Sequence, residues 1–144
     1  MLYMKKIFNI SVLAVLLVVA PSPCSAMMEL ADVSKERAKE LGMEVRSEAH
    51  GPDQVWVELT FKTEGELKNF GRVELEIREG KKFLLVATLK EDQYRAKPGQ
   101  VVVGFTVDRT LLDKASLVVV AGRPMDMTGY LLRIKDFVEP GKAR

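Results

Sequence analysis

The strict alternation of apolar and polar side chains in the middle of the chain is the feature that most constrains its fold. Residues 54–63 (QVWVELTFKT) and residues 71–79 (GRVELEIRE) both alternate along their length. The repeated apolar residues are Val55, Val57, Leu59 and Phe61 in the first segment and Val73, Leu75 and Ile77 in the second. A two-residue period is typical of a strand with one face buried and the other in solvent. Both segments are therefore predicted to be half-buried β-strands.

Other segments have the composition of strands and bring the predicted number to seven. They are residues 43–49, 82–90, 100–107, 116–122 and 130–138. Gly80 permits the positive φ that a tight hairpin needs, so the third and fourth strands are predicted to be paired neighbours. Residues 108–115, with one helical turn, and residues 123–129 are predicted to be loops. Strands at this spacing predict an all-β fold, a seven-stranded antiparallel sandwich, in place of βαβ units.

Residues 29–42 (ELADVSKERAKELG) form the one stretch with a helical pattern. Asp32 or Ser34 can cap its start, and Gly42 suits the left-handed position that ends a helix. So short a helix is marginal alone in water, and we expect it to dock on the rest of the fold. The predicted organisation is an N-terminal extension with a short helix at 27–42, a β-sandwich domain at 43–138 and a disordered tail at 139–144.

The strand count, the tight hairpin between the third and fourth strands and the turn between the fifth and sixth resemble immunoglobulin-like and fibronectin-III-like sandwiches. Trp56, in the second strand, lies where fibronectin-III domains place their core tryptophan. The resemblance covers residues 43–138. It implies, by analogy, a binding or structural module.

The N-terminus has the three parts of a secretory signal peptide. Lys5 and Lys6 precede an apolar run of 14 residues, and PSPCSA then ends with small residues at Cys24 and Ala26. A membrane-spanning helix needs about 20 apolar residues, which disfavours an uncleaved anchor. The prolines before Cys24 disfavour lipid attachment to its thiol, the other alternative. We expect cleavage of residues 1–26 and export to the periplasm or the outside of the cell, with no stable membrane anchor.

Removal of residues 1–26 changes the charge and the thiol chemistry of the chain. The 22 basic residues fall to 20, equal to the 20 acidic ones, and the single cysteine, Cys24, is lost. A neutral domain gives no support for nucleic-acid binding, which favours clustered positive charge. Without cysteine, the exported chain has no thiol nucleophile, thiolate metal ligand or redox pair.

No catalytic constellation is visible in the sequence. His50 is the single histidine, and no serine stands in a nucleophile-elbow context. Glu74 and Glu76 alternate with Arg72 and Arg78, which is typical of a solvated ladder of mixed charge. The sequence therefore predicts a non-enzymatic protein without a cofactor.

The predicted function is binding or structural support, with an unknown protein or envelope component as partner. Loops commonly hold the contact residues of such folds, and the loops AHGPD, YRAKPGQ and GRPMDMTGY are expected at one end. The candidate contact residues are Tyr94, Arg95, Arg123 and Tyr130. The alternative is a periplasmic copper carrier, because thioether sulfur suits Cu(I). Its candidate ligands are His50, Met125 and Met127.

The later strands have more apolar side chains than one buried face can hold. Phe83, Leu85 and Leu89 are expected to face the core. The residues then expected to face outward are Leu84, Val86, Val102, Val118 and Val120. Soluble monomers rarely expose large contiguous apolar patches. Either the N-terminal helix covers this face with Leu30, Val33 and Leu41, or the face mediates self-association or another protein interaction.

Overall fold

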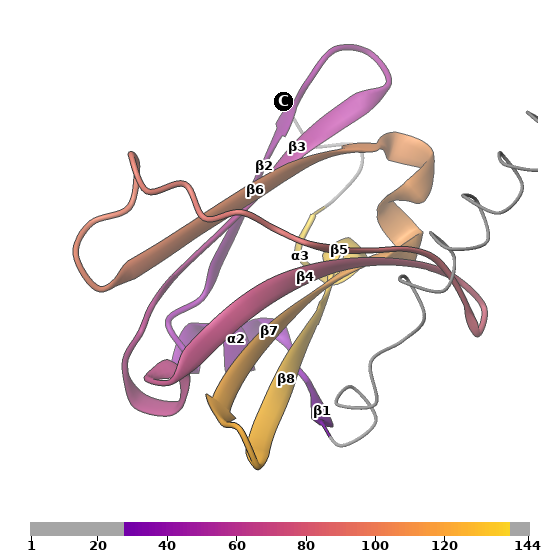
Figure 1. The fold of residues 1–144 in the computed structure, drawn as a ribbon. Coiled ribbons are helices and arrows are strands. Elements are labelled where there is room, and N and C mark those ends of the chain that lie inside the picture. The colour runs from indigo at the N-terminus through magenta and orange to yellow at the C-terminus, as the bar shows by residue number, and fades with distance from the viewer. Residues whose placement is uncertain (1–27, 139–144) are drawn as a thin grey trace, which may run out of the picture.

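Two β-sheets make up most of the described chain, residues 28–138, in the computed structural model (Figure 1). The strands are β1 (Glu29–Asp32), β2 (Glu44–Ala49), β3 (Gln54–Lys62), β4 (Phe70–Glu79), β5 (Lys82–Thr88), β6 (Gln100–Asp108), β7 (Ala115–Arg123) and β8 (Asp126–Arg133). The helical segments are α2 (Lys35–Glu40), η2 (Gly65–Leu67), η3 (Arg109–Lys114) and α3 (Ile134–Phe137). The prediction of an all-β fold is confirmed. The predicted signal peptide, with Cys24, and the predicted tail at 139–144 lie outside the described residues.

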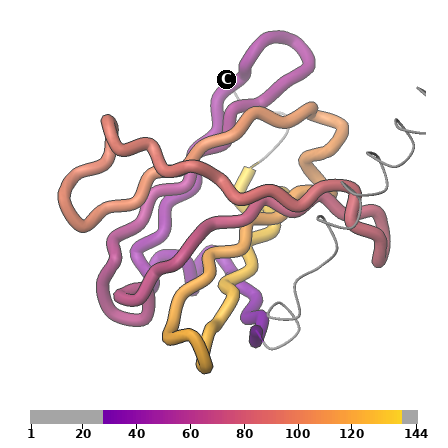
Figure 2. The backbone as a smooth tube through the Cα atoms, in the orientation of Figure 1, coloured from indigo at the N-terminus to yellow at the C-terminus, as the bar shows by residue number. Residues whose placement is uncertain are grey.

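The two sheets differ in width. The larger has five strands in the order β1-β8-β7-β4-β5, and the smaller has three in the order β2-β3-β6. Neighbouring strands are antiparallel except β1, which runs parallel to β8. After β5 the chain crosses to the smaller sheet, where Glu91 forms an isolated bridge with Val103 (Figure 2). This crossing joins the edges of the two sheets on one side.

The hydrophobic core lies between the sheets and takes residues from both. Its largest fully buried side chains include Leu59, Phe61, Leu67, Leu112, Leu117 and Leu132. Val33 and Ala38 of the N-terminal segment belong to the same core, so α2 docks on it. This docking accounts for a helix of six residues that would not persist alone in water.

The N-terminal segment is a strand followed by a helix, where the sequence predicts a helix over 29–42. β1 adds to the edge of β8, and the backbone N–H of Val33 continues the pairing by donating to the carbonyl of Leu131 at 2.9 Å. The helix begins only after this, where the Ser34 hydroxyl accepts from the backbone N–H of Arg37 at 3.1 Å. Pairing with β8 therefore overrides the local helical preference. β1 raises the described strands to eight, against the predicted seven.

The C-terminal part also departs from the prediction. Residues 123–129 are not a loop, because Arg123 pairs with Asp126 across a two-residue turn at the end of β7. Gly122 has φ +126°, a conformation that L side chains rarely adopt, and it allows this tight reversal. β8 runs from Asp126 to Arg133, so it begins earlier and ends earlier than the predicted last strand at 130–138. That predicted strand corresponds to the second half of β8 followed by α3.

Trp56 lies on the outer face of the smaller sheet, so the core position implied by the fibronectin-III resemblance is wrong. Its ring lies over Gly104 of β6, and it is not part of the core. On the outer face of the larger sheet, the outward-facing Val118 and Val120 are buried, so this part of the face is covered. Leu30 and Met28 come close to Gly129 beside Val118, so part of the cover over this sheet comes from β1 and the residue before it.

Replacing Gly122 with alanine should destabilise the fold by about 1–3 kcal/mol. A Cβ there would lie 2.3 Å from the carbonyl oxygen of Asp126, in addition to the unfavourable φ. Urea denaturation followed by tryptophan fluorescence measures the change. Gly71→Ala in β4 is the matched control, because its Cβ would meet only the carbonyl oxygen of Val120 at 3.5 Å. Equal losses in the two variants would contradict the prediction.

Candidate functional site

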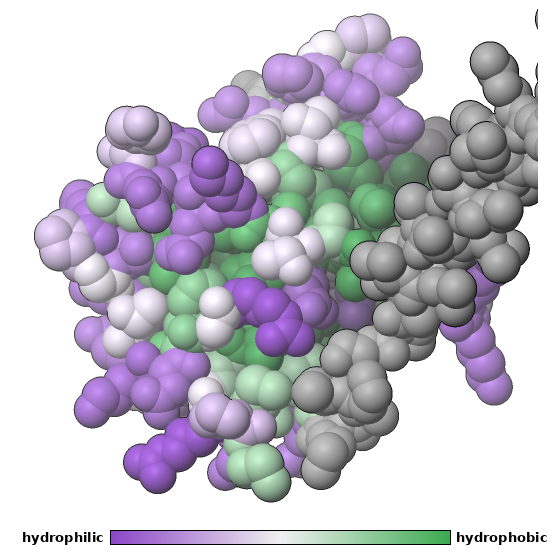
Figure 3. Space-filling model, viewed as in Figure 1, coloured by the Kyte–Doolittle hydropathy of each residue, from purple (hydrophilic) through white to green (hydrophobic). Residues whose placement is uncertain are grey.

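The edge strand β5 exposes large apolar side chains. Phe83, Leu84, Leu85 and Val86 are consecutive and have 44–52% of their surface accessible. In Figure 3 apolar side chains gather in the middle of the face across which β5 runs in Figure 1, with hydrophilic residues around them. A run of this kind on a sheet edge is unusual, because edge strands commonly have charges that discourage pairing with another chain. In this strand no charged residue lies between Phe83 and Thr88.

The exposure of β5 follows from the unequal widths of the sheets. The larger sheet extends beyond the three strands of the smaller one, and β5 is its last strand on one side. Leu85 pairs with Ile77 of β4, which is buried, yet Leu85 remains 44% exposed. The register with β4 shifts between Ile77 and Arg78, and Phe83 stacks on the outer face with its ring 4.2 Å from the Arg78 guanidinium carbon. The expectation that Phe83 and Leu85 are buried core residues is therefore wrong.

The backbone of β5 has a free side as well as exposed side chains. The N–H of Leu89 donates to the carbonyl of Val73 at 2.8 Å, so the backbone groups of Leu89 face β4. Because antiparallel pairs alternate, those of Ala87 and Leu85 also face β4, and those of Val86 and Thr88 face away from it. Within the described residues, no strand pairs with this outer side of β5. It can accept a further strand.

A buried carboxylate marks the outer face of the smaller sheet. Glu58 in β3 has a side chain only 9% exposed, and both of its oxygens accept hydrogen bonds from the guanidinium of Arg95. The longer bond, from Nη2 to Oε1, measures 3.2 Å. Asp92 positions Arg95 by accepting from its backbone N–H at 3.3 Å. The ion pair therefore ties the loop between β5 and β6 to the middle of the sheet.

Gly104 provides the room for the ring of Trp56. It lies opposite Glu58 in the register of β3 and β6. A Cβ at Gly104 would lie 2.1 Å from the ring of Trp56. The missing side chain thus leaves the space on β6 that the tryptophan ring occupies. The sequence signal for this arrangement is the single glycine inside an otherwise apolar strand.

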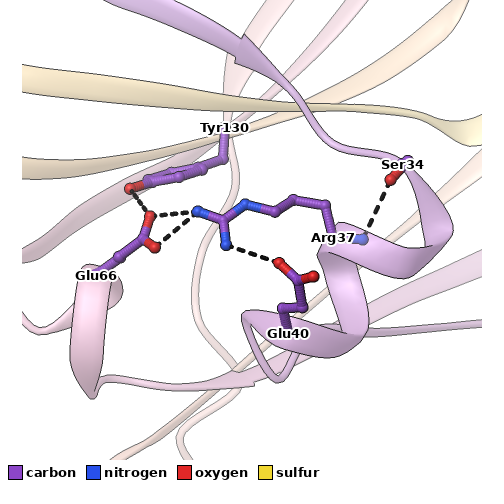
Figure 4. Close-up of polar contacts among 5 residues, drawn as sticks. All are labelled: Ser34, Arg37, Glu40, Glu66 and Tyr130. Carbon is purple, nitrogen blue, oxygen red and sulfur yellow. Dashed lines mark hydrogen bonds and ion pairs between the residues drawn. The ribbon is translucent and has the colours of Figure 1, made fainter.

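A second polar cluster joins α2, η2 and β8 (Figure 4). Nη2 of Arg37 donates to both carboxylate oxygens of Glu66, at 2.7 and 2.6 Å, and Nη1 donates to Glu40 at 3.1 Å. The hydroxyl of Tyr130 also donates to Glu66, at 3.2 Å. These contacts connect segments that are far apart in sequence. They secure the N-terminal segment to the sheet.

The ion pair shifts the pKa values of its members. The Arg37 guanidinium, followed by the Tyr130 hydroxyl, lowers the pKa of Glu66, although partial desolvation opposes the shift. The pKa of Tyr130 is raised, first by burial and then by its hydrogen bond to the Glu66 carboxylate. At neutral pH the cluster therefore contains an ionised Glu66 and a neutral phenol that donates to it. This arrangement is typical of a structural contact and has no group poised for proton transfer.

The structure separates the predicted contact residues. Tyr94 is fully exposed in the loop after β5, Arg95 binds Glu58, Arg123 is exposed at the turn between β7 and β8, and Tyr130 is buried under α2. The turn containing His50 lies at the opposite end from Arg123 (Figure 1). It precedes the start of β3, which pairs with the end of β6, and η3 leads from there to the start of β7, whereas Arg123 is at the end of β7. The three loops therefore do not share one end of the fold.

The same arrangement separates the candidate copper ligands. Met125 is 90% exposed at the far end of β7, and Met127 follows it in β8. His50 lies in the β2–β3 turn, with the length of β7 between it and Met125. Residues 28–138 contain no group of three or more His, Cys, Asp or Glu side chains that could hold a metal ion. In the same range, no helix is both long enough and apolar enough to cross a membrane.

Comparisons with protein-family models, curated proteins and solved structures found no match to this chain.

Replacing Glu66 with glutamine should make the loss of thermal stability at acidic pH less steep. The lowered pKa of Glu66 means that its ion pair stabilises the fold above the ordinary glutamate pKa. That contribution is lost as the pH falls through the lower folded-state value. Thermal unfolding between about pH 6 and pH 3 should show a shallower decline for Glu66→Gln than for the parent chain. Glu48→Gln, at an exposed position of β2, is the control and should leave the slope unchanged.

Replacing Arg95 with alanine should destabilise the fold by about 1–2 kcal/mol, because it leaves the Glu58 carboxylate buried without its cation. The expected loss is below that of a fully buried pair, since the Arg95 side chain is 56% exposed. Urea denaturation of a double-mutant cycle with Glu58→Leu checks the cause. In the Glu58→Leu background, Arg95→Ala should cost little. An equal loss in both backgrounds would show that Arg95 acts without Glu58.

Proposed function

We propose that this chain is an exported, non-enzymatic β-sandwich module that binds another polypeptide through the edge of β5. The single observation that carries the proposal is the coincidence, on one strand, of a free hydrogen-bonding edge and four consecutive exposed apolar side chains. Addition of a strand to a sheet edge gives affinity through the backbone and specificity through alternate side chains. β5 offers both kinds of contact.

The strand order supports an immunoglobulin-like arrangement for this module. If β1 is set aside, the seven strands β2 to β8 follow the chain order of strands A to G in such domains. β2, β3 and β6 then correspond to A, B and E, and β4, β7 and β8 correspond to C, F and G. The fourth strand, β5, pairs with β4 in place of β6. Immunoglobulin-like folds host many unrelated functions, so this arrangement is compatible with a binding role and does not specify the partner.

Export rests on the signal-like residues 1–26, which predict a partner outside the cytoplasm, such as an envelope component. The non-enzymatic part of the proposal has support from the described polar clusters. Glu66 and Glu58 each have an arginine partner, and these pairs hold loops and the N-terminal segment to the sheets. Their contacts account for the carboxylates as structural groups.

A photo-crosslinking amino acid at Val86 should capture a polypeptide when the chain is produced in cells with its own N-terminus. Val86 has 52% of its surface exposed, and its backbone groups face away from β4, so a partner strand would lie within reach. Mass spectrometry of the adduct measures the outcome. Positions Glu48, on a different edge strand, and Tyr94, in the loop after β5, are the comparisons.

An adduct at Val86 and none at Glu48 is the expected result. No adduct at Val86 would overturn the proposal. Capture at Tyr94 alone would assign binding to the loop between β5 and β6, and would equally contradict a role for the β5 edge.

A further inference from the structure

We infer that the polypeptide bound by the β5 edge is a second copy of this chain, added antiparallel about a two-fold axis at Val86. This inference rests on the proposed function and names its partner. Each copy offers one such edge, so the contact is isologous and closes as a dimer. The two larger sheets would then form one continuous sheet of ten strands.

The side chains of β5 are of the kind that an added strand needs in order to pair with the β5 edge. Its exposed apolar side chains lie on both faces of the strand, with Phe83 beside Arg78 on the outer face and Leu85 opposite Ile77 on the inner face. A strand that binds here must likewise present apolar residues on both faces. β2, the edge of the smaller sheet, alternates Glu44 and Arg46 with less polar residues and does not meet this requirement. A second β5 does.

The backbone limits the registers that are possible, and the side chains favour the one centred on Val86. Val86 and Thr88 direct their backbone groups away from β4, so these residues must form the hydrogen-bonded pairs with an added strand. Centring the axis on Val86 pairs Val86 with Val86, Leu85 with Ala87, and Leu84 with Thr88 of the second copy. In each unlike pair the larger side chain faces a smaller one. No two like charges meet within this segment, which would otherwise oppose pairing.

In the same register, one like-charged pair lies at each end of the paired stretch, with Lys82 opposite Lys90. Both lysines are exposed, where salt screens their repulsion. Substitution of one of these exposed lysines therefore tests the register without disturbing the fold.

The free edge ends where the chain crosses to the smaller sheet. From Glu91 onward the same side of the segment is bound to β6, with the N–H of Asp92 donating to the carbonyl of Val102 at 2.7 Å. The accessible part is thus the short stretch from Lys82 to Lys90. An added strand of this length buries a small interface, and interfaces of that size are typically weak. We therefore expect a dimer that dissociates on dilution.

Sedimentation velocity of the chain expressed from its full sequence should show a monomer–dimer equilibrium over about a hundredfold range of concentration. Val86→Lys should weaken the dimer by about a hundredfold or more, because two ammonium groups would meet at the axis. Met125→Lys is the matched control, since it also places a lysine at an exposed apolar position, but far from β5. It should leave the dimer unchanged.

Lys90→Glu is the second variant, and it should strengthen the dimer by about threefold to tenfold. It converts both Lys82–Lys90 contacts into opposite-charge pairs. Lys97→Glu makes the same change of net charge in the exposed loop before β6 and should have no such effect. Circular dichroism of all four variants confirms that each is folded.

A chain that stays monomeric at every concentration would overturn the inference, and so would a dimer that Val86→Lys leaves intact. A dimer that Lys90→Glu fails to strengthen beyond Lys97→Glu would overturn the register. The crosslink at Val86 separates this inference from the proposed function. An adduct of twice the chain mass supports both. An adduct with a different polypeptide keeps the β5 edge as a binding surface and removes the second copy as its occupant.

Discussion

The burial of alternating apolar faces between two sheets is the interaction on which the rest of the structure depends. β3 and β4 place every second side chain in the same core, and residues of β6, β7, β8 and α2 complete it. The N-terminal segment docks there through Val33 and Ala38, and the short helix is stable only because of that contact. With no cysteine among residues 28–138, packing, hydrogen bonds and ion pairs stabilise the described fold without a disulfide.

The unequal width of the two sheets explains why apolar residues remain exposed. A five-stranded sheet cannot be covered along its whole width by a three-stranded one. β1 occupies one edge of the larger sheet with a short strand that has Glu29 and Asp32 at its ends. β5 occupies the other edge, with apolar side chains on both faces and a free backbone side. The exposed apolar edge is thus a consequence of the topology.

The polar clusters have a different role. Arg37 with Glu66 and Tyr130, and Arg95 with Glu58, each join a loop or helix to a strand distant in sequence. Ionic contacts of this kind add modest stability when one partner is exposed. Their main effect is to fix the positions of α2 and of the loop after β5. The second of these contacts holds in place the segment that limits the free edge of β5.

Much of the fold could be predicted from local patterns, whereas the candidate site could be predicted only in part. The alternation in β3 and β4 predicts both strands within a residue or two, and Gly80 predicts the turn after β4. The helical composition of 29–42 was misleading at its start, since pairing with β8 outweighs helix propensity at β1. The sequence predicts a loop over 123–129 in place of the two-residue turn at 124–125, because Gly122, and no residue within the turn itself, adopts the unusual φ.

The sequence by itself determined the β class, the excess of apolar residues in the later strands and the signal-like N-terminus, because each depends on residues close together in the chain. Only the tertiary structure decided which apolar residues stay exposed. Val118 and Val120, expected to face outward, are covered and buried, while Phe83 and Leu85, expected in the core, are exposed. The side chains of both pairs are suited to either environment. What differs is whether their strand lies in the middle of the larger sheet or beyond the edge of the smaller one.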